Sequence, residues 1–89
     1  MNFEWDKTKA YTNHRKHGIS FLEASEVFND EHSSCVYDPD HSDKEDRFLL
    51  FGVSSQGTAL VVSYTERSDT IRLISARRMT RQERKAYEG

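Results

Sequence analysis

The residues best suited to chemistry are arginines at the ends of β-rich segments in the second half of the chain. Arg47 begins one such segment, Arg67 stands at a turn, and Arg77 follows an alternating run that starts at Ile71. A guanidinium group binds phosphate oxygens through two parallel hydrogen bonds and keeps its charge at physiological pH. It can also neutralise the charge that gathers on a phosphorane. The pattern is typical of a phosphate site, and equally typical of a surface with exposed ion pairs.

The last β-rich segment carries further arginines, and its alternation separates them. Over residues 71–78, Arg72 and Arg78 fall on one face of the expected strand and Arg77 falls on the other. All three can therefore serve a single site only if the strand twists or contains a bulge.

The first expected helix has an organised polar face. Lys9, Asn13, Lys16 and His17 follow one another at helical spacing and form one cationic edge. Such an edge can bind a polyanion, although a solvated surface gives the same pattern. His14, which shares its side of the helix with an alanine, is expected to pack inward.

Composition limits the classes of protein to which the chain can belong. The formal net charge is -2, with acids concentrated in residues 38–46 and bases in residues 72–85, so a polyanion would meet the C-terminal part first. The lone cysteine, Cys35, excludes an internal disulfide, and the first residues contain no apolar stretch for a signal peptide or membrane span. We therefore expect a cytoplasmic protein with no membrane contact.

The sequence lacks motifs for cofactors and for activated nucleophiles. His14 and His17 are the only close histidine pair, and no further zinc ligand stands at a usual interval. There is no G-x-S-x-G elbow and no glycine-rich phosphate loop. We expect neither a metal ion nor another cofactor.

Local signals predict an α+β fold in one domain, residues 1–89. Asp6 and Gly18 delimit the first helix, and capping boxes begin a second helix at Ser20 and a last one at Thr80. Short turns join the strands into an antiparallel meander. The expected elements are helices at 6–17, 20–29 and 81–87 and strands at 35–37, 47–54, 58–66 and 71–77.

This order of elements predicts how the layers pack. The two N-terminal helices lie on one face of an antiparallel sheet of three to four strands, and a short C-terminal helix follows. The other face of the sheet remains available for a ligand.

Taken together, these residues resemble the BrnT family of toxins over essentially the whole chain. The matching segments include F-E-W-D at 3–6, K-H-G-I at 16–19, D-P-D-H-S at 38–42, Y-T-E-R at 64–67 and I-R-L-I-S-A-R-R at 71–78. The resemblance implies a RelE-like fold, metal-independent endonucleolytic cleavage of RNA, and growth arrest. It also implies a BrnA antitoxin that wraps the toxin and binds operator DNA through its own DNA-binding domain, so that the toxin meets this DNA only indirectly.

Two positions depart from the family's pattern. Tyr64 stands where the family often has histidine, and Lys7 stands where it often has proline. Tyrosine is a weak base, so Tyr64 can transfer a proton only if neighbouring arginines lower its pKa.

RNA carries its own nucleophile, the 2′-hydroxyl, so the implied nuclease needs groups for orientation, proton transfer and charge neutralisation. We assign Arg47, Arg67 and Arg77 to the scissile phosphate, Tyr64 to proton transfer, and His17 to the same task as second candidate. The residues expected to bind RNA elsewhere are Lys9, Asn13, Lys16, Arg72, Arg78 and Arg81, with Trp5 stacking on a base.

Three other roles agree with the same sequence. The chain could be a catalytically weak module that only holds its antitoxin, activity having decayed with the change to Tyr64. It could be a sequence-specific DNA-binding protein, which the basic C-terminal helix favours and the overall acidity disfavours. The basic edge could also dock the ribosome.

Overall fold

A three-stranded antiparallel meander forms the centre of the sheet, as the sequence predicts. The computed structural model describes residues 1–88 and places β3 at Arg47–Val53, β4 at Ala59–Arg67 and β5 at Thr70–Arg78. Gly57, with a φ of 82°, lies in the β3–β4 turn, where glycine takes a positive φ at no steric cost. Ser68, with a φ of 57°, lies in the β4–β5 turn.

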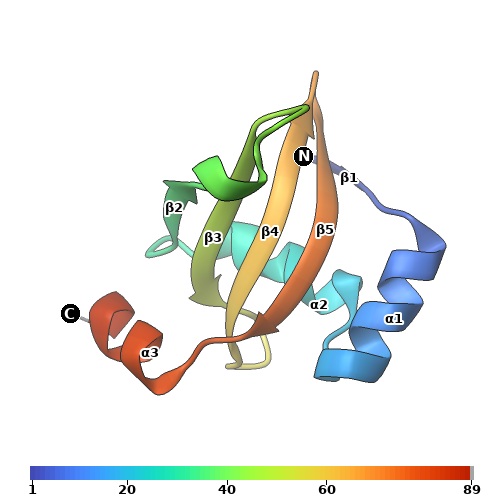
Figure 1. Ribbon diagram of the computed structural model, residues 1–89. Coiled ribbons are helices and arrows are strands. Elements are labelled where there is room, and N and C mark those ends of the chain that lie inside the picture. Colours follow the sequence, from blue (N-terminus) through green and yellow to red (C-terminus); the bar gives the residue numbers. More distant parts are fainter. Residues whose placement is uncertain (89) are drawn as a thin grey trace.

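Two short strands extend this meander into a mixed sheet of five, in the order β1-β5-β4-β3-β2 (Figure 1). β2 (Ser34–Tyr37) pairs antiparallel with β3, whereas β1 (Asn2–Glu4) pairs parallel with β5. The prediction of an antiparallel sheet of three to four strands is therefore wrong at the N-terminus, because it omits β1 and its parallel pairing. Three residues are too few to show the alternation by which a strand is recognised in a sequence.

The three predicted helices form, and their caps are those expected. The helical elements are α1 Lys7–His17, α2 Phe21–Glu26, the 3-10 turns η1 Val27–Asn29 and η2 Pro39–His41, and α3 Arg81–Glu88. The Asp6 side chain accepts a hydrogen bond from the backbone N–H of Lys9, and Gly18 ends α1 in the left-handed conformation. At α3, Thr80 and Glu83 form a complete capping box, because each side chain accepts from the other's backbone N–H.

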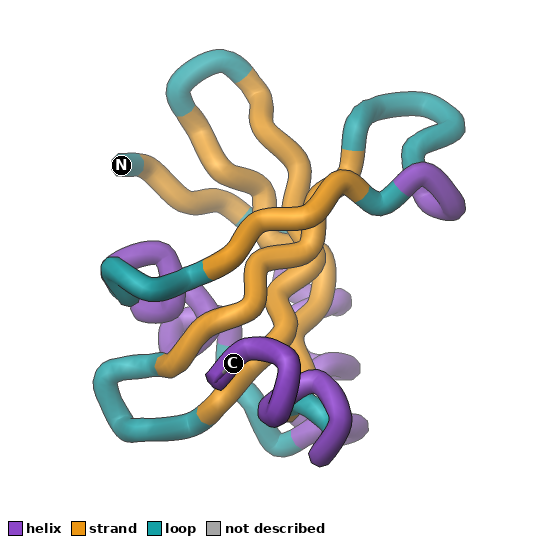
Figure 2. Tube along the Cα trace, turned by 90° about the vertical axis from the view of Figure 1, so that its left-hand side faces the viewer, coloured by secondary structure: helices purple, strands orange, loops and turns teal. Residues whose placement is uncertain are grey.

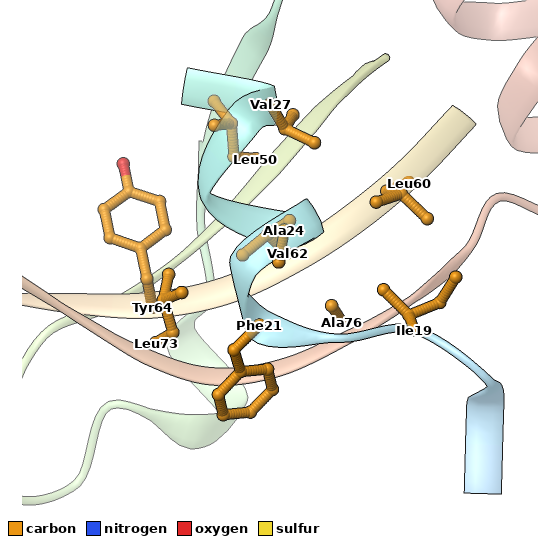
Figure 3. Close-up of a cluster of buried hydrophobic side chains, with 10 residues drawn as sticks. All are labelled: Ile19, Phe21, Ala24, Val27, Leu50, Leu60, Val62, Tyr64, Leu73 and Ala76. Carbon is orange, nitrogen blue, oxygen red and sulfur yellow. The ribbon is translucent and has the colours of Figure 1, made fainter. Parts of the chain in front are cut away.

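The hydrophobic core lies between α2 and one face of the sheet, which we call the helix face. Figure 3 shows this cluster of buried side chains, which consists of Ile19, Phe21, Ala24, Val27, Leu50, Leu60, Val62, Tyr64, Leu73 and Ala76. We call the opposite side the open face; in Figure 1 it points toward the viewer, with α2 behind the sheet. Figure 2 views the molecule from the side on which α3 lies. The sheet therefore has one face filled by core packing and another that helices cover only at its ends.

Helix α1 packs along the outer edge of β5 rather than on the sheet face, which corrects the predicted layer (Figure 1). Asn13 is only 6% exposed, and its side-chain amide donates to the Ala76 and Ile19 carbonyls and accepts from the Ala76 N–H. The Asn13 side chain thus forms the backbone hydrogen bonds that a neighbouring strand would form, at a part of β5 that does not pair with β1. Asn13, expected on the cationic edge as an RNA-binding residue, is thus buried, and His14, expected inside, is exposed.

A bulge in β5 changes which arginines share a face. Tyr64 of β4 pairs with Leu73, but the preceding Ser63 pairs with Ser75, which leaves Ile74 without a partner on β4. One extra residue reverses the alternation of side chains beyond it. Arg72 and Arg77 consequently both lie on the open face, while Arg78 lies on the helix face, opposite to the grouping that strict alternation predicts.

Candidate functional site

Three arginines lie together at one end of the open face. Arg47 pairs across the sheet with Thr65, which pairs with Arg72, so all three side chains belong to one row on the same face. Arg67 lies two residues beyond Thr65 on β4 and therefore points to the same side. We call Arg47, Arg67 and Arg72 the arginine cluster.

Carboxylates hold two members of this cluster. Arg72 forms an ion pair with Glu4 of β1, and Arg67 pairs with Glu45 at 3.2 Å between Nη2 and Oε1. The hydrogen bonds that Arg67 donates to Glu45 raise the pKa of Arg67, so this group stays charged throughout the physiological range. An exposed pair such as Arg67–Glu45 contributes only about 0–1 kcal/mol, so a phosphate group can replace that carboxylate at small cost; the Arg72–Glu4 pair is partly buried.

Arg47 differs from its two neighbours in its electrostatic environment. Among residues 1–88, no carboxylate lies within ion-pair distance of its guanidinium group. The side chain lines an open hollow of about 350 Å³, together with Asp40, His41, Asp43, Lys44 and Glu45. Arg47 is thus half-buried and without a carboxylate partner among the described residues, at a hollow that three acidic residues also line.

The loop that precedes β3 brings a histidine to this hollow, and the sequence analysis did not select it. His41 Nδ1 lies 2.9 Å from Asp38 Oδ2. In Figure 1 this segment, the green turn next to β3, lies in front of the sheet. One sequence signal could have identified this histidine. It is the D-x-x-H spacing of Asp38 and His41, in a turn shortly before Arg47.

Arg77 lies apart from the arginine cluster, although it shares the open face. It stands five residues beyond Arg72 on β5, which corresponds to roughly 16 Å along an extended strand. Its guanidinium group forms two hydrogen bonds with Glu83 of α3, at 2.8 and 2.9 Å. The assignment of Arg77 to the same phosphate as Arg47 and Arg67 is therefore not supported by the geometry.

Tyr64 belongs to the buried core cluster (Figure 3) and lies on the face of the sheet opposite to the arginine cluster, so the geometry does not support its assignment to proton transfer there. Its ring packs against Phe28 and Phe48, and its hydroxyl lies 3.2 Å from Cys35 Sγ. Burial raises the pKa of Tyr64 well above its ordinary value, whereas the assignment required a lowered pKa. The arginines that were to lower it lie on the other face of the sheet.

Four of the remaining predicted residues lie in the groove beside α1 or in the core. His17, Lys9 and Lys16 line a shallow groove of about 320 Å³ between α1 and β5, which we call the basic groove. Trp5 packs edge-on against Phe21, with ring centroids 5.9 Å apart, so it contributes to the core rather than offering a free stacking surface.

Arg78 and Arg81 lie near the end of the sheet opposite to the arginine cluster. Arg78 donates from Nη1 to the His17 carbonyl at 3.4 Å, and Arg81 is exposed in the first turn of α3. His17 therefore lies between the end of β5 and the basic groove, outside the arginine cluster.

The described residues also bear on metal binding and on membrane insertion. Within residues 1–88, no three histidine, cysteine or acidic side chains gather where they could hold a metal ion. None of the helices described is both long and apolar enough to cross a membrane.

Comparisons with known proteins agree with these features. A family model described as "Ribonuclease toxin, BrnT, of type II toxin-antitoxin system" matches residues 5–83. The fold is similar to the crystal structure, at 1.1 Å resolution, of the Brucella abortus ribonuclease toxin BrnT, with 25% identity, a TM-score of 0.66, and coverage of 91% of this chain and 99% of that chain. No curated protein matches the sequence significantly. The chain therefore belongs to the BrnT family of ribonuclease toxins of type II toxin-antitoxin systems.

Proposed function

We propose that the chain cleaves RNA at the arginine cluster, without a metal ion. A ribonuclease toxin of a type II system has RNA as its substrate and a protein antitoxin as its partner. The observation that carries the location is the cross-strand row of Arg47, Thr65 and Arg72, which sets two guanidinium groups on one face with Arg67 beside them. The site stands on paired strands rather than on loops, so its members keep their spacing.

The chemistry follows from the substrate's own reactivity. The 2′-hydroxyl attacks the adjacent phosphorus, and the charge that develops on the phosphorane needs neutralisation in place. Arg47 has no carboxylate partner among the described residues and meets the phosphate first. Arg67 then exchanges Glu45 for a phosphate oxygen, because an exposed pair is weak, and Arg72 adds its charge beside it.

The basic groove binds the RNA strand that flanks the cleaved bond. Lys9 and Lys16 line it without any acidic side chain, and it follows the stretch of β5 that β1 leaves uncovered. Ser75, at its edge, lies three residues from Arg72, or about 10 Å along the strand. Lysine ammonium groups attract the phosphate backbone irrespective of base sequence.

Single-turnover cleavage of a labelled transcript of mixed sequence tests both parts of this proposal. We expect Arg47→Ala and Arg67→Ala each to lower the rate at saturating protein by about 10²-fold or more, as for other donors to a transition-state oxyanion. The double change of Lys9 and Lys16 to alanine should instead weaken RNA binding and leave the saturated rate nearly unchanged. Arg84→Ala, on the exposed side of α3, is the matched control. Equal rates for the control and the cluster variants would contradict the location.

The partner that silences this activity is a BrnA-like antitoxin with its own DNA-binding domain. The toxin then reaches operator DNA only through the antitoxin. Co-expression with the product of the neighbouring reading frame tests this part: we expect a stable complex that does not cleave the transcript and binds promoter DNA. Promoter binding by the toxin alone would contradict it.

A further inference from the structure

We propose that His41, held by Asp38, takes the proton from the attacking 2′-hydroxyl. This inference rests on the proposed ribonuclease function and adds the group that the arginine cluster cannot supply, since guanidinium groups do not accept protons. Neither residue that the sequence suggested for this task, Tyr64 or His17, lies at the cluster.

The His41 ring is fixed on one side and free on the other. Its Nδ1 lies 2.9 Å from Asp38 Oδ2, and the Asp38 side chain is 14% exposed whereas that of His41 is 64% exposed. A carboxylate can only accept a hydrogen bond, so Nδ1 carries the hydrogen and Nε2 presents a lone pair to solvent. This is the tautomer that a general base requires.

Backbone hydrogen bonds tie the His41 turn to the first residue of β3. The Asp38 N–H donates to the Arg47 carbonyl at 2.9 Å. Ser42 Oγ donates to the Asp38 carbonyl at 2.6 Å and accepts from the Arg47 N–H at 2.9 Å. The histidine and the arginine without a carboxylate partner are thus held in fixed relation at the wall of one hollow.

Several charged groups surround His41. Asp38 lies at Nδ1, and the other charged side chains around the hollow are Asp40, Asp43, Lys44, Glu45 and Arg47. Imidazole is the side chain whose proton exchange ordinarily falls near neutral pH.

The step balances without any further reactant. Nε2 of His41 removes the 2′-hydroxyl proton, the 2′-oxygen–phosphorus bond forms, and the 5′-oxygen–phosphorus bond breaks. The leaving 5′-oxygen takes a proton from water, and the imidazolium later returns its proton to solvent. The products are a 2′,3′-cyclic phosphate and a 5′-hydroxyl.

The test is single-turnover cleavage of the same transcript between pH 5 and 9. We expect His41→Gln to lower the rate by about 10²- to 10⁴-fold and to flatten its pH dependence, as for loss of a general base. Asp38→Asn should lower the rate less and change the pH profile, because the amide no longer fixes the tautomer. His14→Gln, at an exposed histidine on α1, should behave like the unchanged protein.

Two further measurements separate proton transfer from a structural role of the turn. His41→Gln should bind an all-deoxy version of the oligonucleotide as tightly as the unchanged protein does, and added imidazole should restore part of the rate in His41→Ala. An unchanged rate and profile in His41→Gln would overturn the assignment, and so would lost affinity with no imidazole rescue. If the unchanged protein itself leaves RNA intact, the proposed function fails first.

Discussion

At the level of single residues, the sheet separates packing from chemistry by face. The same strand, β4, sends Tyr64 into the aromatic core and Arg67 to the open face. Tyr64 needs a partner for its buried hydroxyl and finds Cys35, while Arg67 finds Glu45 at the surface. A tyrosine in this position stabilises the fold and has no route to a phosphate on the other side.

The change Tyr64→Phe tests this separation of the two faces. We expect cleavage of the mixed-sequence transcript to stay within about twofold of the unchanged protein. The free energy of unfolding should change by about 1 kcal/mol, the usual net contribution of one hydrogen bond. A fall in rate of 10²-fold in a folded variant would return Tyr64 to the catalytic site.

Residue types that bind phosphate were visible in the sequence, but their surroundings were not. Arg47 and Arg67, which the sequence assigned to one phosphate, lie at the same end of one sheet face, because strand-end arginines in a meander come close together. Asn13 was misjudged because a helical wheel cannot reveal that a neighbouring strand lacks a partner. His41 was missed because its importance depends on a contact with Asp38 within an irregular turn.

At the level of elements, local chemistry predicts helices well and the sheet's edges poorly. Caps at Asp6, Gly18 and Thr80 act over three or four residues, so the sequence contains the whole signal. By contrast, β1 pairs with residues almost seventy positions away, and the β5 bulge arises from the register between two strands. Only the folded sheet decides which side of β5 each arginine occupies.

Helix α3 is held to the sheet by polar contacts rather than by buried apolar residues. Glu83 pairs with Arg77 of β5, and the Tyr87 hydroxyl donates to the Asp30 carboxylate. The hydrogen bonds from Arg77 lower the pKa of Glu83 to about 2, and the bond to Asp30 raises the pKa of Tyr87 to about 12. Both contacts therefore depend on ionised carboxylates.

The Glu83 pair predicts how the stability of the protein changes with acid. Because the folded-state pKa lies below the ordinary value of 4.5, ionised Glu83 stabilises the fold above that pH, and this contribution is lost as the pH falls toward about 2. We expect Glu83→Gln to reduce the free energy of unfolding by up to about 1 kcal/mol at neutral pH. In urea unfolding, this difference should shrink between pH 4.5 and 2.

A matched variant controls for the loss of any surface carboxylate on the same helix. Glu88→Gln removes the exposed pair with Arg84, whose atoms lie 3.6 Å apart, and should cost less than about 0.5 kcal/mol. A Glu83→Gln effect that is equal at all pH values would contradict the ion-pair account of α3 docking.

At the scale of the whole molecule, charge is arranged for local binding rather than for general attraction of nucleic acid. The net charge is -2, yet bases line the basic groove and the arginine cluster, while acids gather in the loop before β3. The basic groove therefore attracts an RNA strand, whereas the acids of the loop border the arginine cluster itself. Binding through the groove should weaken with salt. The family resemblance pointed to the function. In our proposal, the open face of the mixed sheet carries the site for it.

The chemical nature of the RNA ends tests the central claim most directly. We predict that the protein cleaves RNA in the presence of EDTA and leaves a 2′,3′-cyclic phosphate and a 5′-hydroxyl, because the 2′-hydroxyl is the nucleophile. DNA of the same sequence should remain intact, since it lacks that group. Products with a 3′-hydroxyl and a 5′-phosphate, or cleavage abolished by EDTA, would contradict the claim.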